Sequence, residues 1–208
     1  MQLRRVLAVL ISCAPVVAFP ALAQEATPDC SHDRERLLAL DEQAFDQDLS
    51  NGGGGWRALD NRPGCTQVAA DLIRDYRQRH DNHASILYWH EAQLRASLND
   101  YPAAIALMRR SHKPAEANSG GWNEYVDASI AFLEKDRPAL LDARERLSQL
   151  KPPGEVQLDE QGRFEITLDD GQKFKMRWPP NIDVVDGLIH CFDRSYDEAY
   201  GSACRPAQ

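Results

Sequence analysis

The middle of the chain carries a repeated helical pattern of apolar and polar residues. Apolar side chains recur there at spacings of three and four, with charged residues between them, which is typical of amphipathic helices. Glycine and proline interrupt the pattern and separate the segments. We therefore expect a short turn over residues 56–59 and helices over residues 31–49, 66–80, 84–98, 102–111, 122–133 and 138–150.

The C-terminal part changes to the alternating pattern of β-strands over residues 155–178. Two three-residue loops with glycine in third position would align Leu158 with Phe164 and Ile166 with Phe174. We expect a three-stranded antiparallel meander, followed by a helix over residues 181–191 and a shorter one near 193–200. Its apolar face would consist of Val156, Leu158, Phe164, Ile166, Leu168, Phe174 and Met176.

The chain therefore divides into segments of different character. A length of 208 residues is typical of one domain or of one domain with an appendage. We expect a signal peptide over residues 1–23, a helical domain over 24–151, and a C-terminal part over 152–208. A small sheet needs a partner to cover its apolar face, so we expect the C-terminal part to pack on the helical domain.

Two segments of the helical part share one layout at an offset of 36 residues. Ala92 then aligns with Ala128 and Asp100 with Asp136, while Ala69 aligns with Ala104 at an offset of 35. Such a period is the signature of stacked helix pairs.

On these residues, positions 52–150 resemble the tetratricopeptide repeat (TPR) family of antiparallel helix pairs of about 34 residues. The matching signature is Tyr88, Ala92, Tyr101 and Ala104, with Asp100 at the turn. The chain departs from the family at Glu91, where leucine is usual, at Arg95, where tyrosine is usual, and at Arg137, which replaces the turn tyrosine. The fold class expected is mainly α, a TPR-like stack with the small meander. A helical bundle without repeats is the alternative.

The resemblance also implies a ligand groove. In the family, the equivalent positions of successive first helices line a concave wall, which here would carry Trp89, Gln93, Trp122, Tyr125 and Ser129. Aromatic, amide and hydroxyl groups are suited to holding an extended peptide or a helix. The alternative is that Trp89 and Tyr125 pack between helices, because large aromatic side chains of helix pairs usually lie in the core.

Charge and motifs narrow the function. The 32 Asp and Glu residues outnumber the 24 Lys and Arg residues, and this negative balance disfavours nucleic acid as a partner. The chain has no uninterrupted apolar run of the length that a transmembrane segment needs. His80, His83 and His90 need not share one helix face, so we expect no metal and no cofactor. We expect a non-catalytic module that binds a protein or peptide. The alternative is a small periplasmic hydrolase whose acidic pair is hidden by distance.

The cysteines indicate an oxidising compartment. Besides Cys13, the chain has Cys30, Cys65, Cys191 and Cys204, which allow three pairings. Proximity favours Cys30 with Cys65 and Cys191 with Cys204. Such disulfides are typical of exported proteins, so we expect a periplasmic or secreted location.

The first residues have the layout of a secretory signal. Arg4 and Arg5 precede a segment without charge that ends in Ala21-Leu22-Ala23. We expect cleavage after Ala23. The alternative is a lipoprotein that is acylated at Cys13.

The exported protein should accordingly begin at Gln24. Intact mass spectrometry of the exported protein checks this start. A diacylglyceryl mass on Cys13 would show instead that the lipoprotein alternative holds.

Overall fold

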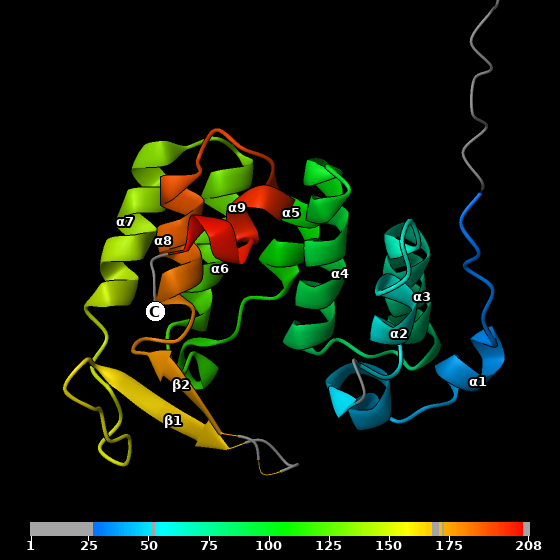
Figure 1. Ribbon diagram of the computed structural model, residues 1–208, viewed down its shortest axis with the longest axis horizontal. Coiled ribbons are helices and arrows are strands. Elements are labelled where there is room, and N and C mark those ends of the chain that lie inside the picture. Colours follow the sequence, from blue (N-terminus) through cyan, green and yellow to red (C-terminus); the bar gives the residue numbers. More distant parts are fainter. Residues whose placement is uncertain (1–26, 51–52, 168–170, 172, 206–208) are drawn as a thin grey trace, which may run out of the picture.

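The computed structural model describes residues 27–50, 53–167, 171 and 173–205 (Figure 1). The expected signal peptide and Cys13 lie outside the described residues. Helices dominate, as the spacing of apolar residues predicts. The α-helices are α1 (Arg34–Leu38), α2 (Arg57–Asp60), α3 (Thr66–Arg79), α4 (Ser85–Ser97), α5 (Tyr101–Arg110), α6 (Trp122–Leu133), α7 (Arg137–Ser148), α8 (Ile182–His190) and α9 (Tyr196–Tyr200). None of the described helices combines the length and the apolar character that a membrane span requires.

Helices α5 and α7 begin in the same way, at the 36-residue offset of the sequence. Asp100 and Asp136 each accept a hydrogen bond from a backbone N–H three residues on, which satisfies a donor of the first turn. Each helix then has proline in its first turn, where the missing N–H costs nothing. The residue before each aspartate, Asn99 and Lys135, has a left-handed φ of 62° and 58°. The sharp turn from α4 to α5 is therefore repeated between α6 and α7.

Helix α4 is shared by two hydrophobic cores. Leu87 and Leu94 belong to the N-terminal core, which contains residues of α1, α2 and α3. Trp89, Ala92 and Ala96 belong to the C-terminal core, which contains residues of α5 to α9. Apolar residues therefore cover two sides of α4, and the rest of its surface remains for polar contacts.

The predicted helix over residues 31–49 is not continuous. The structure has α1, then a break, then a π-helical turn over Gln43–Gln47. The break follows from two polar contacts. The hydroxyl of Tyr76 donates to the Leu40 carbonyl at 3.0 Å, and the Asp41 carboxylate accepts from Ala44 N–H at 2.8 Å, so a new turn starts at Asp41.

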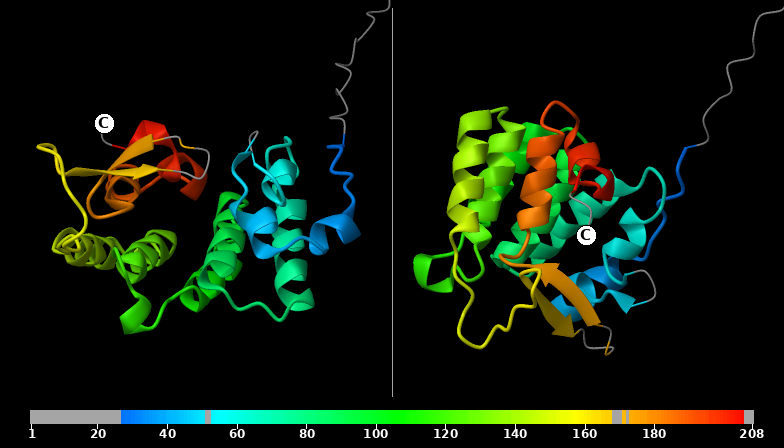
Figure 2. Two further views of the ribbon diagram at one scale, coloured as in Figure 1. Left: turned by 90° about the horizontal axis from the view of Figure 1, so that it is seen from below. Right: turned by 60° about the vertical axis from the view of Figure 1, so that its left-hand side comes forward.

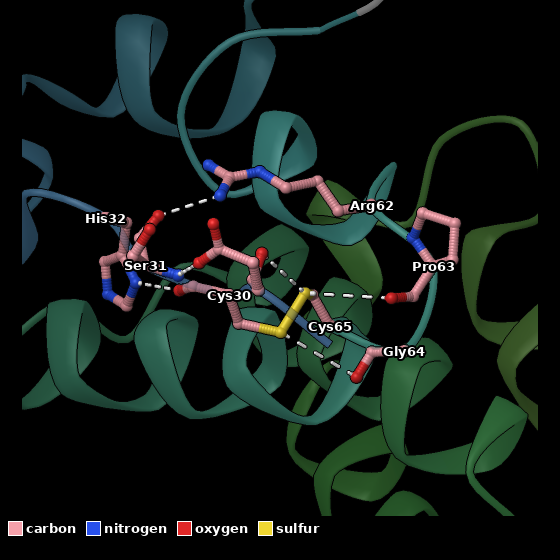
Figure 3. Close-up of a disulfide and its surroundings, with 8 residues drawn as sticks. Cys30, Ser31, His32, Arg62, Pro63, Gly64 and Cys65 are labelled. Atoms are coloured by element: carbon pink, nitrogen blue, oxygen red, sulfur yellow. Dashed lines mark hydrogen bonds between the residues drawn. A yellow bond between two sulfur atoms is a disulfide. The ribbon is translucent and has the colours of Figure 1, made fainter. Parts of the chain in front are cut away.

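A disulfide ties the N-terminal segment to the start of α3, as proximity in the sequence predicts (Figure 3). Cys30 and Cys65 are joined with Cα atoms 5.5 Å apart. Arg62 donates to the Ser31 carbonyl at 2.7 Å beside the bond, and Figure 3 shows its guanidinium directed at that oxygen. The second disulfide joins Cys191, after α8, to Cys204. The two disulfides are consistent with an extracellular or periplasmic protein.

Within the described residues, the C-terminal sheet has two strands rather than three. Strands β1 (Arg163–Thr167) and β2 (Lys173–Arg177) pair antiparallel with Ile166 opposite Phe174, which confirms the predicted register. The loop residues 168–170 lie outside the described residues. The predicted strand before β1 does not form, and a turn at Asp159 takes its place, with the Asp159 N–H donating to the Arg163 carbonyl at 2.8 Å. The N–H of Val156 instead bonds to Pro153 in a turn, so it cannot join the ladder.

Helices α8 and α9 pack on the helical hairpins. Contacts join α8 to α6 and α7, and α9 to α4. The left-hand view of Figure 2 shows the C-terminal segments together on one side of α6 and α7. The sheet is attached nearby, where the indole of Trp178 donates to the Leu150 carbonyl at 2.7 Å. The last helices therefore complete the C-terminal core.

A buried carboxylate, Asp46, holds the π-helical turn against α4. It is fully buried and accepts hydrogen bonds from the Trp56 indole and from His90 Nδ1, each at 2.7 Å. Burial alone would raise the pKa of Asp46, but the hydrogen bond and charge of His90, with Trp56 and Arg57, lower it below its usual value.

This shift predicts how Asp46 contributes to stability at different pH. Because the folded pKa is lowered, the contribution is complete above the unfolded value of about 3.9 and is lost as the pH falls through the folded value. We expect Asp46→Asn to lower the free energy of unfolding by about 1–3 kcal/mol at pH 7. The difference from the unmodified protein should narrow below about pH 4. Urea denaturation at pH 7 and pH 3 measures the free energy of unfolding of both proteins. A difference between them that stays the same at the two pH values would contradict the role assigned to ionised Asp46.

Candidate functional site

A polar cleft lies between α3 and α5, with α4 as its floor. Its volume is about 900 Å³. Side chains of all three helices line it, chiefly Asp71, Arg74 and Arg77 of α3, Tyr88, Glu91 and Arg95 of α4, and Ala106 and Arg110 of α5. On α4 the lining residues are spaced three and four apart, which places them on one face of a helix. This face differs from the two apolar sides that enter the cores.

Buried charges form the floor of the cleft. Glu91 is 3 % exposed, and Arg77 and Arg95 are each 8 % exposed. Arg77 donates to Glu91 Oε2 through Nη2 and, at 3.2 Å, through Nε. Arg95 Nη2 lies 3.5 Å from Glu91 Oε1 and donates to Asp71 Oδ1 at 2.7 Å. Each buried charge thus has an opposite charge beside it, which offsets the cost of removing it from water.

The pKa of Asp71, on one wall of the cleft, is lowered. Burial acts to raise the pKa of Asp71, but hydrogen bonds from Arg95 and Gln67 and the charges of Arg95 and Arg74 lower it below the usual value. A carboxylic acid that donates a proton near neutral pH needs a raised pKa instead. Among the described carboxyl groups, each resolved shift is downward, as for Asp46 and Asp71.

One end of the cleft is organised around Tyr88. The guanidinium groups of Arg77 and Arg110 lie 4.2 Å and 4.3 Å from the centre of its ring. Arg110 also donates to the Tyr88 hydroxyl oxygen, while His83 Nδ1 lies 2.8 Å from the same oxygen. His83 Nε2 in turn lies 3.1 Å from Asp81. Each contact is a hydrogen bond if Arg110 donates to Tyr88, Tyr88 donates to His83 and His83 donates to Asp81. The hydrogen bonds then form a chain that runs in one direction.

A smaller groove repeats the cleft on the other side of α5. Its volume is about 280 Å³, and it lies between α5 and α7 over α6. Residues Asp127, Ala139 and Arg146 line it, 36 positions after Glu91, Ala103 and Arg110 of the cleft. Two consecutive arginines of α5 line different sites. Arg110 lines the cleft, and Arg109 lines the smaller groove.

The residues predicted to line a concave groove mostly lie in the C-terminal core. Trp89 and Tyr125 are 3 % and 2 % exposed, with ring centres 4.7 Å apart. Ser129 is fully buried and bonds to the Tyr125 carbonyl. Trp122 and Gln93 are half-buried. The hydroxyl of Tyr200, on α9, lies 3.5 Å from that of Tyr125. This burial favours the alternative that Trp89 and Tyr125 are packing residues.

The three histidines considered as metal ligands have separate partners. His80 bonds to the Leu38 carbonyl, His83 to Tyr88 and His90 to Asp46. The described residues contain no group of three or more side chains arranged to hold a metal ion.

Sequence analysis did not identify the polar cleft as a site. The available signal was the pair of departures from the TPR pattern, because Glu91 and Arg95 replace residues that are usually apolar or aromatic. Charge at two such positions of an otherwise buried helix indicates a partner charge nearby. That partner, Arg77, lies on a helix whose own pattern gives no sign of it. Comparison with protein-family models, with curated proteins and with solved structures gives no match for this chain.

Removal of Glu91 should be strongly destabilising. In Glu91→Leu, Arg77 would lose its carboxylate partner while it remains buried, and Arg95 would lose one of two. We expect the free energy of unfolding to fall by about 3–5 kcal/mol, the usual cost of breaking a buried ion pair. The control is Glu134→Leu, which removes an exposed partner of Arg109 and should cost at most about 1 kcal/mol. Urea denaturation compares the two, and equal losses would mean that the buried charges do not depend on Glu91.

Proposed function

We propose that the protein is an exported, non-catalytic module that binds a segment of another polypeptide in the cleft between α3 and α5. The observation that carries this proposal is the open cleft over a floor of paired, buried charges. Because each floor side chain is fixed by its neighbours, the cleft is organised before a ligand arrives, which lowers the entropy cost of binding.

The dimensions of the cleft suit an extended chain. On α3 its lining runs from Gln67 to Gln78, and eleven steps of a helix span about 16 Å. An extended peptide covers that distance with about five residues. The walls offer carboxylate acceptors at Asp71 and guanidinium donors at Arg74, and a peptide backbone needs both kinds of partner.

The proposal places the ligand on a different face from the one that the TPR resemblance implies. The repeated start of α5 and α7 supports a relation to that family, and the proposal retains it. The helix faces that would form the concave wall are in contact with the chain's own C-terminal helices, as the distance between Tyr125 and Tyr200 illustrates. A ligand would have to displace those helices to reach Trp89, whereas the cleft is open.

The lowered pKa of Asp71 favours binding over hydrolysis. Asp71 and Glu91, two acids of the cleft lining, both form ion pairs with Arg95. A carboxylate with a lowered pKa, such as that of Asp71, is a partner for cations rather than a proton donor. Export is proposed from the signal-like first residues, and the two disulfides agree with it.

A steric block of the cleft tests the proposal. Panning a display library of random peptides against residues 24–208, with the disulfides intact, should select binders. We expect Ala106→Trp to weaken their binding at least tenfold, because exposed Ala106 lines the cleft and an indole there would occupy it. Calorimetric titration with the selected peptides gives the affinities.

The matched control is Ala139→Trp, at an exposed alanine that lines the smaller groove. It should leave binding unchanged. If no peptides are selected, or if both variants bind them equally well, the cleft is not the binding site.

A further inference from the structure

We infer that the cleft recognises an acidic side chain of its polypeptide partner, and that Arg110 holds the carboxylate. This inference rests on the proposed function and names the chemistry of the ligand at the Tyr88 end of the cleft. It follows from the ion pairs among the described lining residues, which leave Arg110 without a carboxylate, and from the way Arg110 is held.

Four arginines and four acids line the cleft, so its formal charges balance, but they are not all paired with one another. Arg74, Arg77 and Arg95 share two carboxylates, those of Asp71 and Glu91, apart from the additional contact of Arg74 with Asp75 outside the lining. Arg110 adds a further cation. Within the described part of the chain, Arg110 has no carboxylate at ion-pair distance. Among the described lining residues, Arg110 is therefore the arginine whose charge has no carboxylate partner.

Tyr88 holds Arg110 in a fixed place without using up its binding capacity. The Arg110 guanidinium carbon lies over the Tyr88 ring, and one N–H bonds to the hydroxyl oxygen. A guanidinium has five N–H donors in its plane, so most of them remain for a ligand. Carboxylates bind such an edge through two parallel hydrogen bonds, which makes arginine better suited to them than lysine.

The surroundings limit how much negative charge the cleft accepts. Two acids, Asp81 and Asp100, also line the cleft. The side chain of His83 lies beside Asp81. The whole chain is also acidic, with a formal net charge of −8. A single carboxylate at Arg110 meets a guanidinium that has no carboxylate partner among the described residues, whereas a run of acidic residues would be repelled by Asp81, Asp100 and the overall negative charge. The partner segment is therefore one with an isolated aspartate or glutamate.

The experiment uses peptides selected from the random library, displayed with blocked C-termini. We expect them to be enriched in a single Asp or Glu. Each would be synthesised with that residue intact and with Asn or Gln in its place, and calorimetric titration would measure both. Loss of the carboxylate should weaken binding about tenfold, and so should Arg110→Glu.

The matched control is Arg109→Glu. It changes the neighbouring residue, with the same change of charge, but it lies in the smaller groove and should leave the affinity unchanged. Binding to the cleft should also weaken as salt is raised, because the contact is partly exposed.

The outcomes separate the two proposals. If peptides bind and Ala106→Trp blocks them, but neither the acid-to-amide change nor Arg110→Glu matters, the cleft binds peptides and the acidic specificity is wrong. If peptides with a free C-terminus but no acidic side chain bind, and amidation abolishes their binding, the carboxylate comes from a chain end and the side-chain assignment is overturned. If Ala106→Trp has no effect, the proposed function itself fails.

Discussion

Helix α4 contributes residues to both hydrophobic cores, and the rest of the structure depends on how its remaining surface is used. The helix is 13 residues long. Leu87 and Leu94 pack into the N-terminal core on one side, and Trp89 and Ala92 pack into the C-terminal core on another. A helix between two cores can leave little of its surface to water. Its remaining polar positions must therefore find partners in neighbouring elements, and they do so through His90 with Asp46 and through Glu91 with Arg77 and Arg95.

This constraint explains why the candidate site is charged and yet buried. Glu91 and Arg95 lie where a regular helix pair would place apolar or aromatic side chains, so their charges need opposite charges close by. Arg77 and Asp71 supply these from α3. The resulting network joins α3 to α4 along the floor of the cleft. The cleft between α3 and α5 is therefore lined by charged side chains rather than closed by a continuous apolar surface.

The sequence predicts the local elements better than their assembly. The spacing of apolar residues locates α3 to α8 within about two residues of their observed ends, because burial of one face determines such helices. The register of Ile166 with Phe174 was accessible for a similar reason, since alternation and loop length together define it. The strand expected around Val156 failed because the preceding turn takes up its N–H, which alternation alone does not reveal.

The candidate site was harder to predict because it depends on contacts between distant segments. The TPR resemblance places Trp89 and Tyr125 on a concave wall, and only the position of α9 shows that Tyr200 lies against that wall. Likewise, Glu91 is visible as an anomaly in the sequence, but its partner Arg77 is 14 residues away on another helix. Local patterns carry no information on which helices meet.

The division into two cores also implies that the N-terminal core can form before the C-terminal core while the chain is being synthesised. The N-terminal core draws its buried residues from positions 37 to 94, so it can assemble once roughly half of the chain is available. The C-terminal core needs Tyr196 and Ala199, close to the end of the chain. Until those residues arrive, Trp89 and Ala92 on the far side of α4 have no complete cover. A chain that emerges from its N-terminus thus carries one finished core beside an exposed aromatic surface, and that surface is where a chaperone would bind or aggregation would begin.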